Sequence, residues 1–146
     1  MSTGEPGTAA PLGRSGTVAK IVGEADCVHR GGYDVLSTPS VVRLLEEAAM
    51  AAIEPAIGPG QESVGATVDI AHVRPSVRGQ SVTARATVTA VDRRRISFEV
   101  EVTDDVEVVA HGRHERFIVD DAALEGRLAE KARSAGRTRE EQGTTA

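Results

Sequence analysis

One segment, residues 38–53, is apolar around most of its circumference when it is drawn as a helix. Ser37 or Thr38 suits the N-cap and Pro39 the first helical position, while the run Ile57–Gly60 ends the segment. Such a helix must be buried on nearly all sides by the rest of the chain. Its apolar side chains recur at spacings of three and four residues; they are Val41, Val42, Leu44, Leu45, Ala48, Ala49, Ala52 and Ile53.

Almost everything after the helix has the period of two that is typical of β-strands. The chain has only two Phe, one Tyr and no Trp, so its core must consist of small side chains, many of them β-branched, which favour sheet. A first strand over Thr17–His29 precedes the helix. Four later strands are predicted over Val64–Val73, Gln80–Val91, Arg95–Thr103 and Val106–Val119.

This order of elements predicts an α+β fold. A curved antiparallel sheet of about five strands, wrapped around one long buried helix, is the hotdog architecture, in which two protomers usually pair edge to edge. An open sandwich with the helix on one face is the alternative, but it would leave the far side of the helix in water. The 146 residues fit one domain. We place it at residues 17–120, after a disordered tail (1–16) and before a C-terminal helix and mobile tail (121–146).

Composition argues against several classes of function. The net charge of −5 gives no general attraction to nucleic acid or to an anionic membrane surface. No apolar run reaches the roughly 20 residues of a membrane span, and the first residues do not resemble a secretion signal, so we expect a cytoplasmic protein. The lone Cys27 excludes an internal disulfide. His111 and His114 are three residues apart on a strand and point to opposite faces, so no metal site is predicted.

Three side chains on the helix and the strand after it attract attention. Thr38 lies at the helix start, where free N–H groups favour an anion. Glu46 shares the apolar surface of the helix, where an unpaired carboxylate is costly, whereas Glu47 lies further round beside Arg43. His72 shares one face of its strand with neighbouring Val and Ile, so it is expected to approach the helix.

Together these residues offer a hydroxyl, a carboxylate and an imidazole, which are the groups that acyl transfer needs. Each also has a structural interpretation: Thr38 as a plain N-cap, Glu46 as a satisfied buried acid and His72 as a core histidine. On an ideal helix Thr38 and Glu46 are roughly 12 Å apart along the axis, so they cannot touch within one regular helix.

Three stretches of the sequence resemble the fluoroacetyl-CoA thioesterase family of hotdog enzymes. They are the run Thr38–Glu46, the Pro-Gly-x-x-Ser-Val-Gly-Ala-Thr stretch that leads to His72, and the late strand Gly112–Arg116. The resemblance covers about residues 35–120, without gaps between Thr38 and His72.

The resemblance implies a catalytic set of three side chains and a backbone N–H that holds the thioester carbonyl, which are Thr38, Glu46, His72 and Gly65. We add Tyr33, the aromatic residue nearest to the site in sequence, and Arg116 as substrate-binding residues. No cofactor is implied beyond the coenzyme A of the substrate.

The leading interpretation is therefore hydrolysis of a small acyl-CoA thioester by a homodimer or higher homo-oligomer. The family's fluoroacetyl enzyme has Phe-rich segments ahead of the Thr, whereas Arg30–Leu36 contains no Phe, so we expect no strong preference for the fluorinated group. A hotdog dehydratase or other biosynthetic enzyme acting on a carrier-bound chain is one alternative. A non-catalytic protein that binds an acyl ligand is the other.

Overall fold

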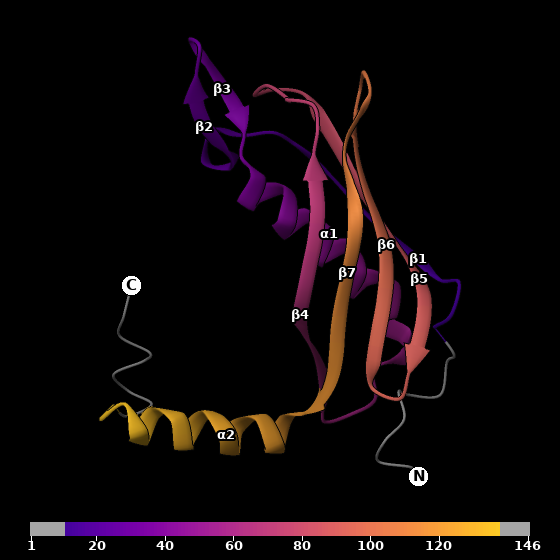
Figure 1. Ribbon diagram of the computed structural model, residues 1–146, viewed down its shortest axis with the longest axis vertical. Helices are drawn as coiled ribbons and strands as arrows, with labels where there is room; N and C mark the ends of the chain where they lie inside the picture. The colour runs from indigo at the N-terminus through magenta and orange to yellow at the C-terminus, as the bar shows by residue number, and fades with distance from the viewer. Residues whose placement is uncertain (1–10, 138–146) are drawn as a thin grey trace.

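The computed structural model describes residues 11–137, and the described chain forms one large sheet, one small hairpin and two helices (Figure 1). The first part of the chain contains β1 (Ser15–Ile21), β2 (Cys27–Arg30), β3 (Tyr33–Leu36) and α1 (Thr38–Ile53). The second part contains β4 (Gln61–His72), β5 (Ser81–Asp92), β6 (Arg95–Asp104), β7 (Val108–Asp120) and α2 (Asp121–Ser134).

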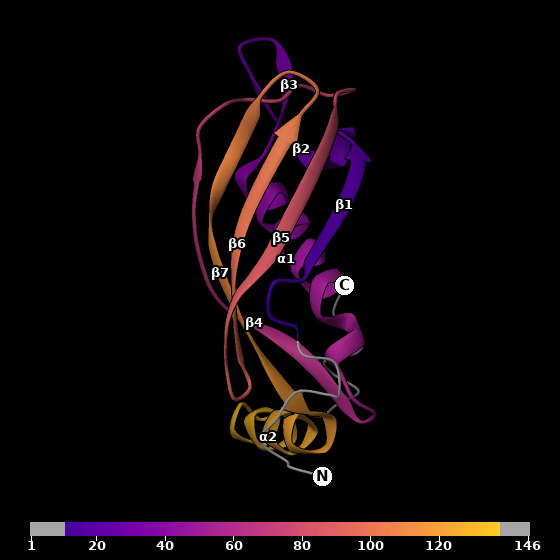
Figure 2. The ribbon, with the colours of Figure 1, turned by 90° about the vertical axis from the view of Figure 1, so that its right-hand side faces the viewer.

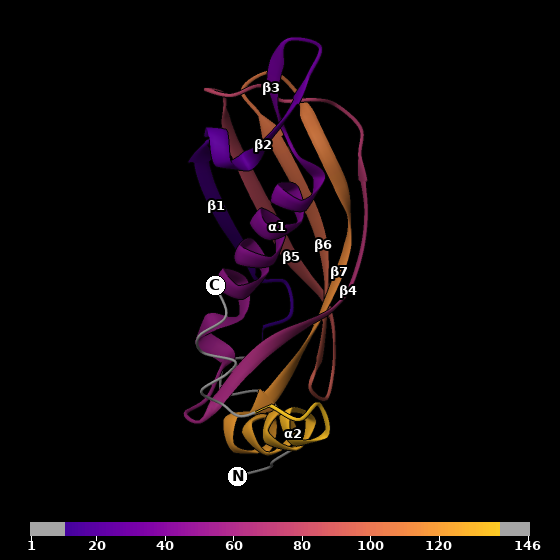
Figure 3. The same ribbon diagram turned by 90° about the vertical axis from the view of Figure 1, so that its left-hand side faces the viewer.

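Five antiparallel strands form the large sheet in the order β1-β5-β6-β7-β4, and α1 lies across one face of it (Figures 2 and 3). The helix packs mainly against β1 and β5. The predicted hotdog arrangement of one long helix against a five-stranded antiparallel sheet is confirmed, and the four later strands lie within a few residues of their predicted bounds.

The core between α1 and the sheet consists mostly of Val, Ala, Ile and Leu, with Phe98 as its largest side chain. Small residues allow the elements to approach closely. At Gly16 on β1, a Cβ atom would overlap backbone atoms of Ala48 and Ala52 in α1. This glycine is therefore required for space, because any side chain would push β1 away from the helix.

The first predicted strand, Thr17–His29, is wrong in its length. β1 ends at Ile21, and after a short 3₁₀ turn the chain forms a separate hairpin from β2 and β3. Gly31 and Gly32 make the two-residue turn with φ values of 57° and 84°, which glycine adopts without steric cost. This hairpin lies beyond the N-terminal end of α1 (Figure 1).

Regular structure begins before residue 17, where we predicted that the domain starts after a disordered tail. Residues 11–14 form a turn in which the Arg14 N–H donates to the Pro11 carbonyl, and β1 starts at Ser15. Residues 1–10 of the predicted tail, and the last residues from 138 onward, lie outside the described residues. The C-terminal helix α2 occupies its predicted place; none of its residues is buried, and Leu128 is 57% exposed.

Helix α1 is less completely covered than its pattern predicted. The sheet buries one side of it, while Arg43, Glu47, Met50 and Ala51 are exposed on the other. The reason is that the sheet covers only one side of the helix in a single chain. The edge strand β4 is also open, since every residue over 65–69 is exposed. Both features leave room for another chain at this edge.

Candidate active site

The predicted hydroxyl and imidazole are in contact. Thr38 is the first residue of α1, after the N-cap Ser37, and its Oγ1 lies 2.9 Å from Nδ1 of His72 at the end of β4. His72 is half-buried, and its other ring nitrogen, Nε2, is buried with no hydrogen-bond partner among the described residues. The imidazole therefore has one nitrogen fixed by Thr38 and one that is buried without a partner among the described residues.

The predicted carboxylate lies in a second cluster, further along α1. Glu46 Oε2 accepts a hydrogen bond from Nη1 of Arg116 at 3.0 Å, and its side chain is 36% exposed against 5% for Arg116. Among the described residues its other oxygen, Oε1, has no hydrogen-bond partner. Glu46 is thus held by one oxygen and open at the other, whereas Glu47 is exposed.

Gly65 on β4 lies against this carboxylate. A Cβ atom built at Gly65 would be 2.5 Å from Glu46 Oε2 and 3.4 Å from Nη1 of Arg116. The φ of Gly65 is not in the left-handed region, so the glycine is needed here for space. Its missing side chain lets Glu46 approach the β4 backbone.

Arg116 has more partners than a substrate-binding role would predict. Besides Glu46, its Nε donates to Ser63 Oγ at 3.0 Å and its Nη2 to the Ser63 carbonyl at 3.2 Å. Nη1 also lies 3.3 Å from Nε2 of His114, which is 1% exposed. The guanidinium is buried and each of its three nitrogens has a partner in the protein, so in this conformation it positions Glu46.

The two clusters are separate within one chain. Thr38 and Glu46 are in one regular helix, so the roughly 12 Å between them predicted from the helical rise still applies. Along β4, His72 lies seven positions after Gly65, which corresponds to roughly 23 Å of extended strand. One chain therefore presents a hydroxyl–imidazole pair and a carboxylate–guanidinium pair at two places on the same surface.

Tyr33 is not joined to either cluster. It lies on β3, opposite Arg30 in the hairpin, with its side chain 65% exposed. The hairpin is anchored at its base, where the N–H groups of Leu36 and Arg78 donate to the carbonyls of Ser76 and Asp34. The hairpin occupies the segment directly before Thr38.

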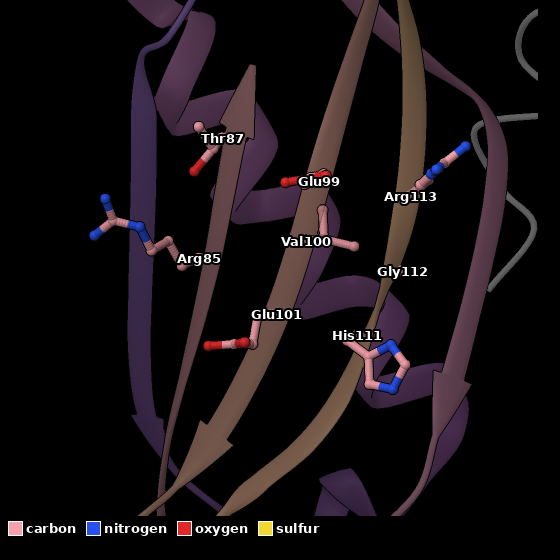
Figure 4. Close-up of a pocket in the computed structure, with 8 residues that line it drawn as sticks. All are labelled: Arg85, Thr87, Glu99, Val100, Glu101, His111, Gly112 and Arg113. Carbon is pink, nitrogen blue, oxygen red and sulfur yellow. The ribbon is translucent and has the colours of Figure 1, made fainter. Parts of the chain in front are cut away.

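A shallow hollow of about 440 Å³ lies on the opposite face of the sheet, with α1 passing behind it (Figure 4). Its strands place opposite charges side by side, with Arg85 paired in register with Glu101 and Glu99 with Arg113. Cross-strand charge pairs of this kind are ordinary on a solvated sheet face. The hollow contains none of the six predicted site residues.

No helix within residues 11–137 is long and apolar enough to cross a membrane. The same residues contain no group of three or more His, Cys, Asp or Glu side chains arranged to hold a metal ion.

The sequence and the fold also match known proteins. The model of the fluoroacetyl-CoA-specific thioesterase family matches residues 18–122, which is most of the chain. The chain belongs to this thioesterase family. A curated relative, the fluoroacetyl-CoA thioesterase of Streptantibioticus cattleyicolor, is 33% identical over 86 residues, which cover 59% of this chain and 62% of the relative. The aligned part thus spans under two thirds of that enzyme.

Solved structures extend the likeness across the whole fold. A structure of the fluoroacetyl-CoA thioesterase superposes with a TM-score of 0.79 at 25% identity, covering 85% of this chain and 98% of that one. A variant of that enzyme in complex with acetyl-CoA gives a TM-score of 0.76 at 25% identity, over 82% and 97% of the two chains. A thioesterase superfamily member from Thermus thermophilus shares the fold, with a TM-score of 0.77 at 23% identity over 85% and 96%.

Sequence reasoning named Arg116 as a substrate-binding residue, but it missed the contact of Arg116 with Glu46 and it missed Ser63 and His114. The Ser63, His114 and Arg116 contacts join strands that are far from Glu46 in sequence, and no spacing rule connects them. One signal was available. Along β7, His114 and Arg116 alternate with exposed neighbours and share the buried face with Ile118, where an apolar residue is expected.

Proposed function

We propose that this chain hydrolyses a small acyl-CoA thioester to the free acid and coenzyme A. The observation that carries the proposal is the Glu46 carboxylate, which Arg116 holds by one oxygen while the other faces no protein donor. Membership of the thioesterase family supports the reaction type, and the acetyl-CoA complex of a relative supports a short acyl-CoA substrate. We place the enzyme in the cytoplasm.

In the proposed reaction, water adds to the acyl carbon, the C–S bond breaks, and the thiolate of coenzyme A leaves and takes up a proton. His72 removes the proton from water, because the Nε2 of its imidazole has no partner among the described residues and an imidazole can act as a general base. Thr38 fixes the ring, and the N–H of Gly65 is aimed at the thioester carbonyl. Glu46 acts at the carbonyl carbon, directly or by aligning water.

The distance between the two clusters leads us to propose that each active site combines them from two protomers. In a two-fold antiparallel pairing of β4 with the partner's β4, an axis between Val68 and Asp69 sets Gly65 opposite the partner's His72. This axis lies within the exposed part of the edge strand, residues 65–69. Thr38 and His72 of one protomer would then meet Glu46 of the other, and the open sheet edge would be covered.

Mixing two inactive variants tests this composite site. If Thr38–His72 and Glu46 come from different protomers, a dimer of one His72→Ala chain and one Glu46→Gln chain has one intact site and one doubly altered site. Random exchange makes half of the dimers mixed, so roughly a quarter of wild-type activity should return. If the set lies within one protomer, every site carries a lesion and mixing restores nothing. A purely monomeric chain in sedimentation at micromolar concentration would also refute the shared site.

The activity itself is tested by a hydrolysis panel over acyl-CoA chain lengths, with carrier-protein thioesters alongside. We expect Glu46→Gln to lower kcat by at least about a hundredfold, since it removes the charge that acts at the carbonyl. The neighbouring Glu47→Gln is the matched control and should change kcat little, because Glu47 is exposed on the same helix. Equal activity of the two variants would refute the role of Glu46. Turnover of carrier-bound chains alone would replace the proposed substrate class.

A further inference from the structure

A buried histidine lies behind the Glu46–Arg116 pair, on the side away from solvent. His114 is on β7, two residues before Arg116 on the same face, and its ring stacks on Phe98 with centroids 5.7 Å apart. Its Nδ1 lies 2.7 Å from the Thr67 carbonyl oxygen on β4, and its Nε2 lies 3.3 Å from Nη1 of Arg116. Both ring nitrogens are therefore engaged.

These two contacts allow only one protonation state. A carbonyl oxygen can only accept, so Nδ1 of His114 must carry the proton that it donates to Thr67. A guanidinium can only donate, so Nε2 must present its lone pair to Arg116. The ring is the neutral Nδ1–H tautomer, because an imidazolium would point a proton at the arginine.

The guanidinium is fixed from several sides as a result. Nη1 donates to both Glu46 and His114, while Nε and Nη2 bond Ser63. His114 accepts on the inner side of Arg116, and Glu46 accepts on the side that faces the proposed substrate. Removing the inner acceptor would leave a buried donor unpaired and would weaken the restraint on Nη1, which would then keep only Glu46 as a partner.

We propose that His114 is a positioning residue for thioester hydrolysis: as a neutral hydrogen-bond acceptor it holds Arg116 in the orientation that aims Glu46 at the acyl carbon. This inference rests on the proposed function of Glu46. His114 touches no reacting atom, and its contribution passes through Arg116.

The electrostatic surroundings agree with this protonation state. Burial, followed by the charge of Arg116, lowers the pKa of His114, whereas the Thr67 hydrogen bond and the charges of Glu46 on α1 and Glu115 on β7 act in the opposite direction. Phe98, the contact on β6, is uncharged. The neutral ring is thus the stable form at neutral pH.

Two substitutions distinguish the hydrogen bond that His114 accepts from the packing of its ring. His114→Phe keeps a flat ring against Phe98 but offers no acceptor, and we expect kcat to fall by roughly 10- to 100-fold with KM changed less than about threefold. His114→Gln packs worse but returns a carbonyl oxygen near Arg116, so it should recover most of that kcat. If His114 were needed only for packing, His114→Phe would have the higher kcat of the two variants. His111→Phe, on the exposed face of the same strand, is the control and should leave kcat unchanged.

A measurement without substrate tests the same inference. Nitrogen NMR of the ring should show His114 with a protonated Nδ1 and an unprotonated Nε2 at pH 7, and the Arg116 side-chain signals should shift in His114→Phe but not in His111→Phe. An Nε2–H tautomer or an imidazolium at pH 7 would overturn the proposal, as would His114→Phe being as active as His114→Gln. A wild-type chain inactive on every thioester would refute the proposed function, while the ring measurement would still decide whether His114 accepts from Arg116.

Discussion

Replacing Gly65 with alanine should remove activity without unfolding the protein. The new Cβ would lie 2.5 Å from Glu46 Oε2, so the carboxylate must retreat by about 1 Å to reach an ordinary contact distance. A displacement of this size at a reacting group costs on the order of a hundredfold in rate. We therefore expect kcat/KM for the best acyl-CoA to fall by about that factor.

The stability cost of the same change should be small. The atom in the way is the end of a flexible side chain that is 36% exposed, and it can move outward while Arg116 keeps Ser63 and His114 as partners. The pair loses at most about 1 kcal/mol at such exposure. Alanine also restricts the unfolded chain more than glycine does, which offsets part of this loss.

Gly16→Ala is the matched control, because the obstacle there is backbone. The added Cβ would overlap Ala48 and Ala52 in α1, and neither atom can move without moving the helix. Overpacking of this kind costs about 1–3 kcal/mol or more. Denaturant unfolding gives the two free energies, and release of the coenzyme A thiol gives the two rates.

Wild-type kcat/KM in Gly65→Ala would refute the displacement of the Glu46 carboxylate. A loss of stability as large as that of Gly16→Ala would refute the small stability cost. A second check uses the Glu46→Gln background. There Gly65→Ala should lower the rate little further, because the two changes act on one carboxylate and their effects are not additive.

Two further predictions concern pH and selectivity. Because the folded-state pKa of His114 lies below its ordinary value of 6.5, the unfolded chain binds the proton first on acidification, so stability should fall as pH drops below about 6.5. The unfolding free energy measured between pH 7.5 and 5.5 should then depend less on pH in His114→Gln than in the wild type, and equal slopes would contradict this. For selectivity, the hairpin before Thr38 has Tyr33 as its only aromatic residue and carries it exposed, so the ratio of kcat/KM for fluoroacetyl-CoA over acetyl-CoA should stay under about a thousand. A larger ratio would mean that another element selects for fluorine.

Periodicity predicted most of the fold because it reports directly on burial. Burial alternates along β5 and β6, and the helix start is marked by Ser37 and Pro39. The β2–β3 hairpin was missed because each strand has only four residues, too few for an alternation to stand out. The open side of α1 was missed because apolar pattern alone does not say which chain covers it.

Some contacts of the candidate site could be predicted from the sequence and others could not. Strand alternation predicted that His72 approaches the helix, and its Nδ1 lies beside Thr38 Oγ1; the helical rise predicted that Thr38 and Glu46 do not touch within one helix, and both are in α1. The partner of Glu46 was not predictable in the same way, since Arg116 is 70 positions away and reaches it across the sheet. Local rules constrain residues that share an element; a contact between α1 and β7 depends on the packing of the whole domain.

The buried face of β7 nevertheless shows how polar residues among apolar ones can indicate such a site. A strand that covers a helix should place apolar side chains inward, and β7 does so at Val109, Ala110 and Ile118. Between them it places His114 and Arg116, two polar groups whose burial is costly unless every donor and acceptor is paired. Apolar residues there would make a simpler core, so the exception requires a reason beyond stability. The reason is that Arg116 holds the Glu46 carboxylate on the neighbouring helix by one oxygen. The costly buried pair is therefore explained by the proposed role of Glu46.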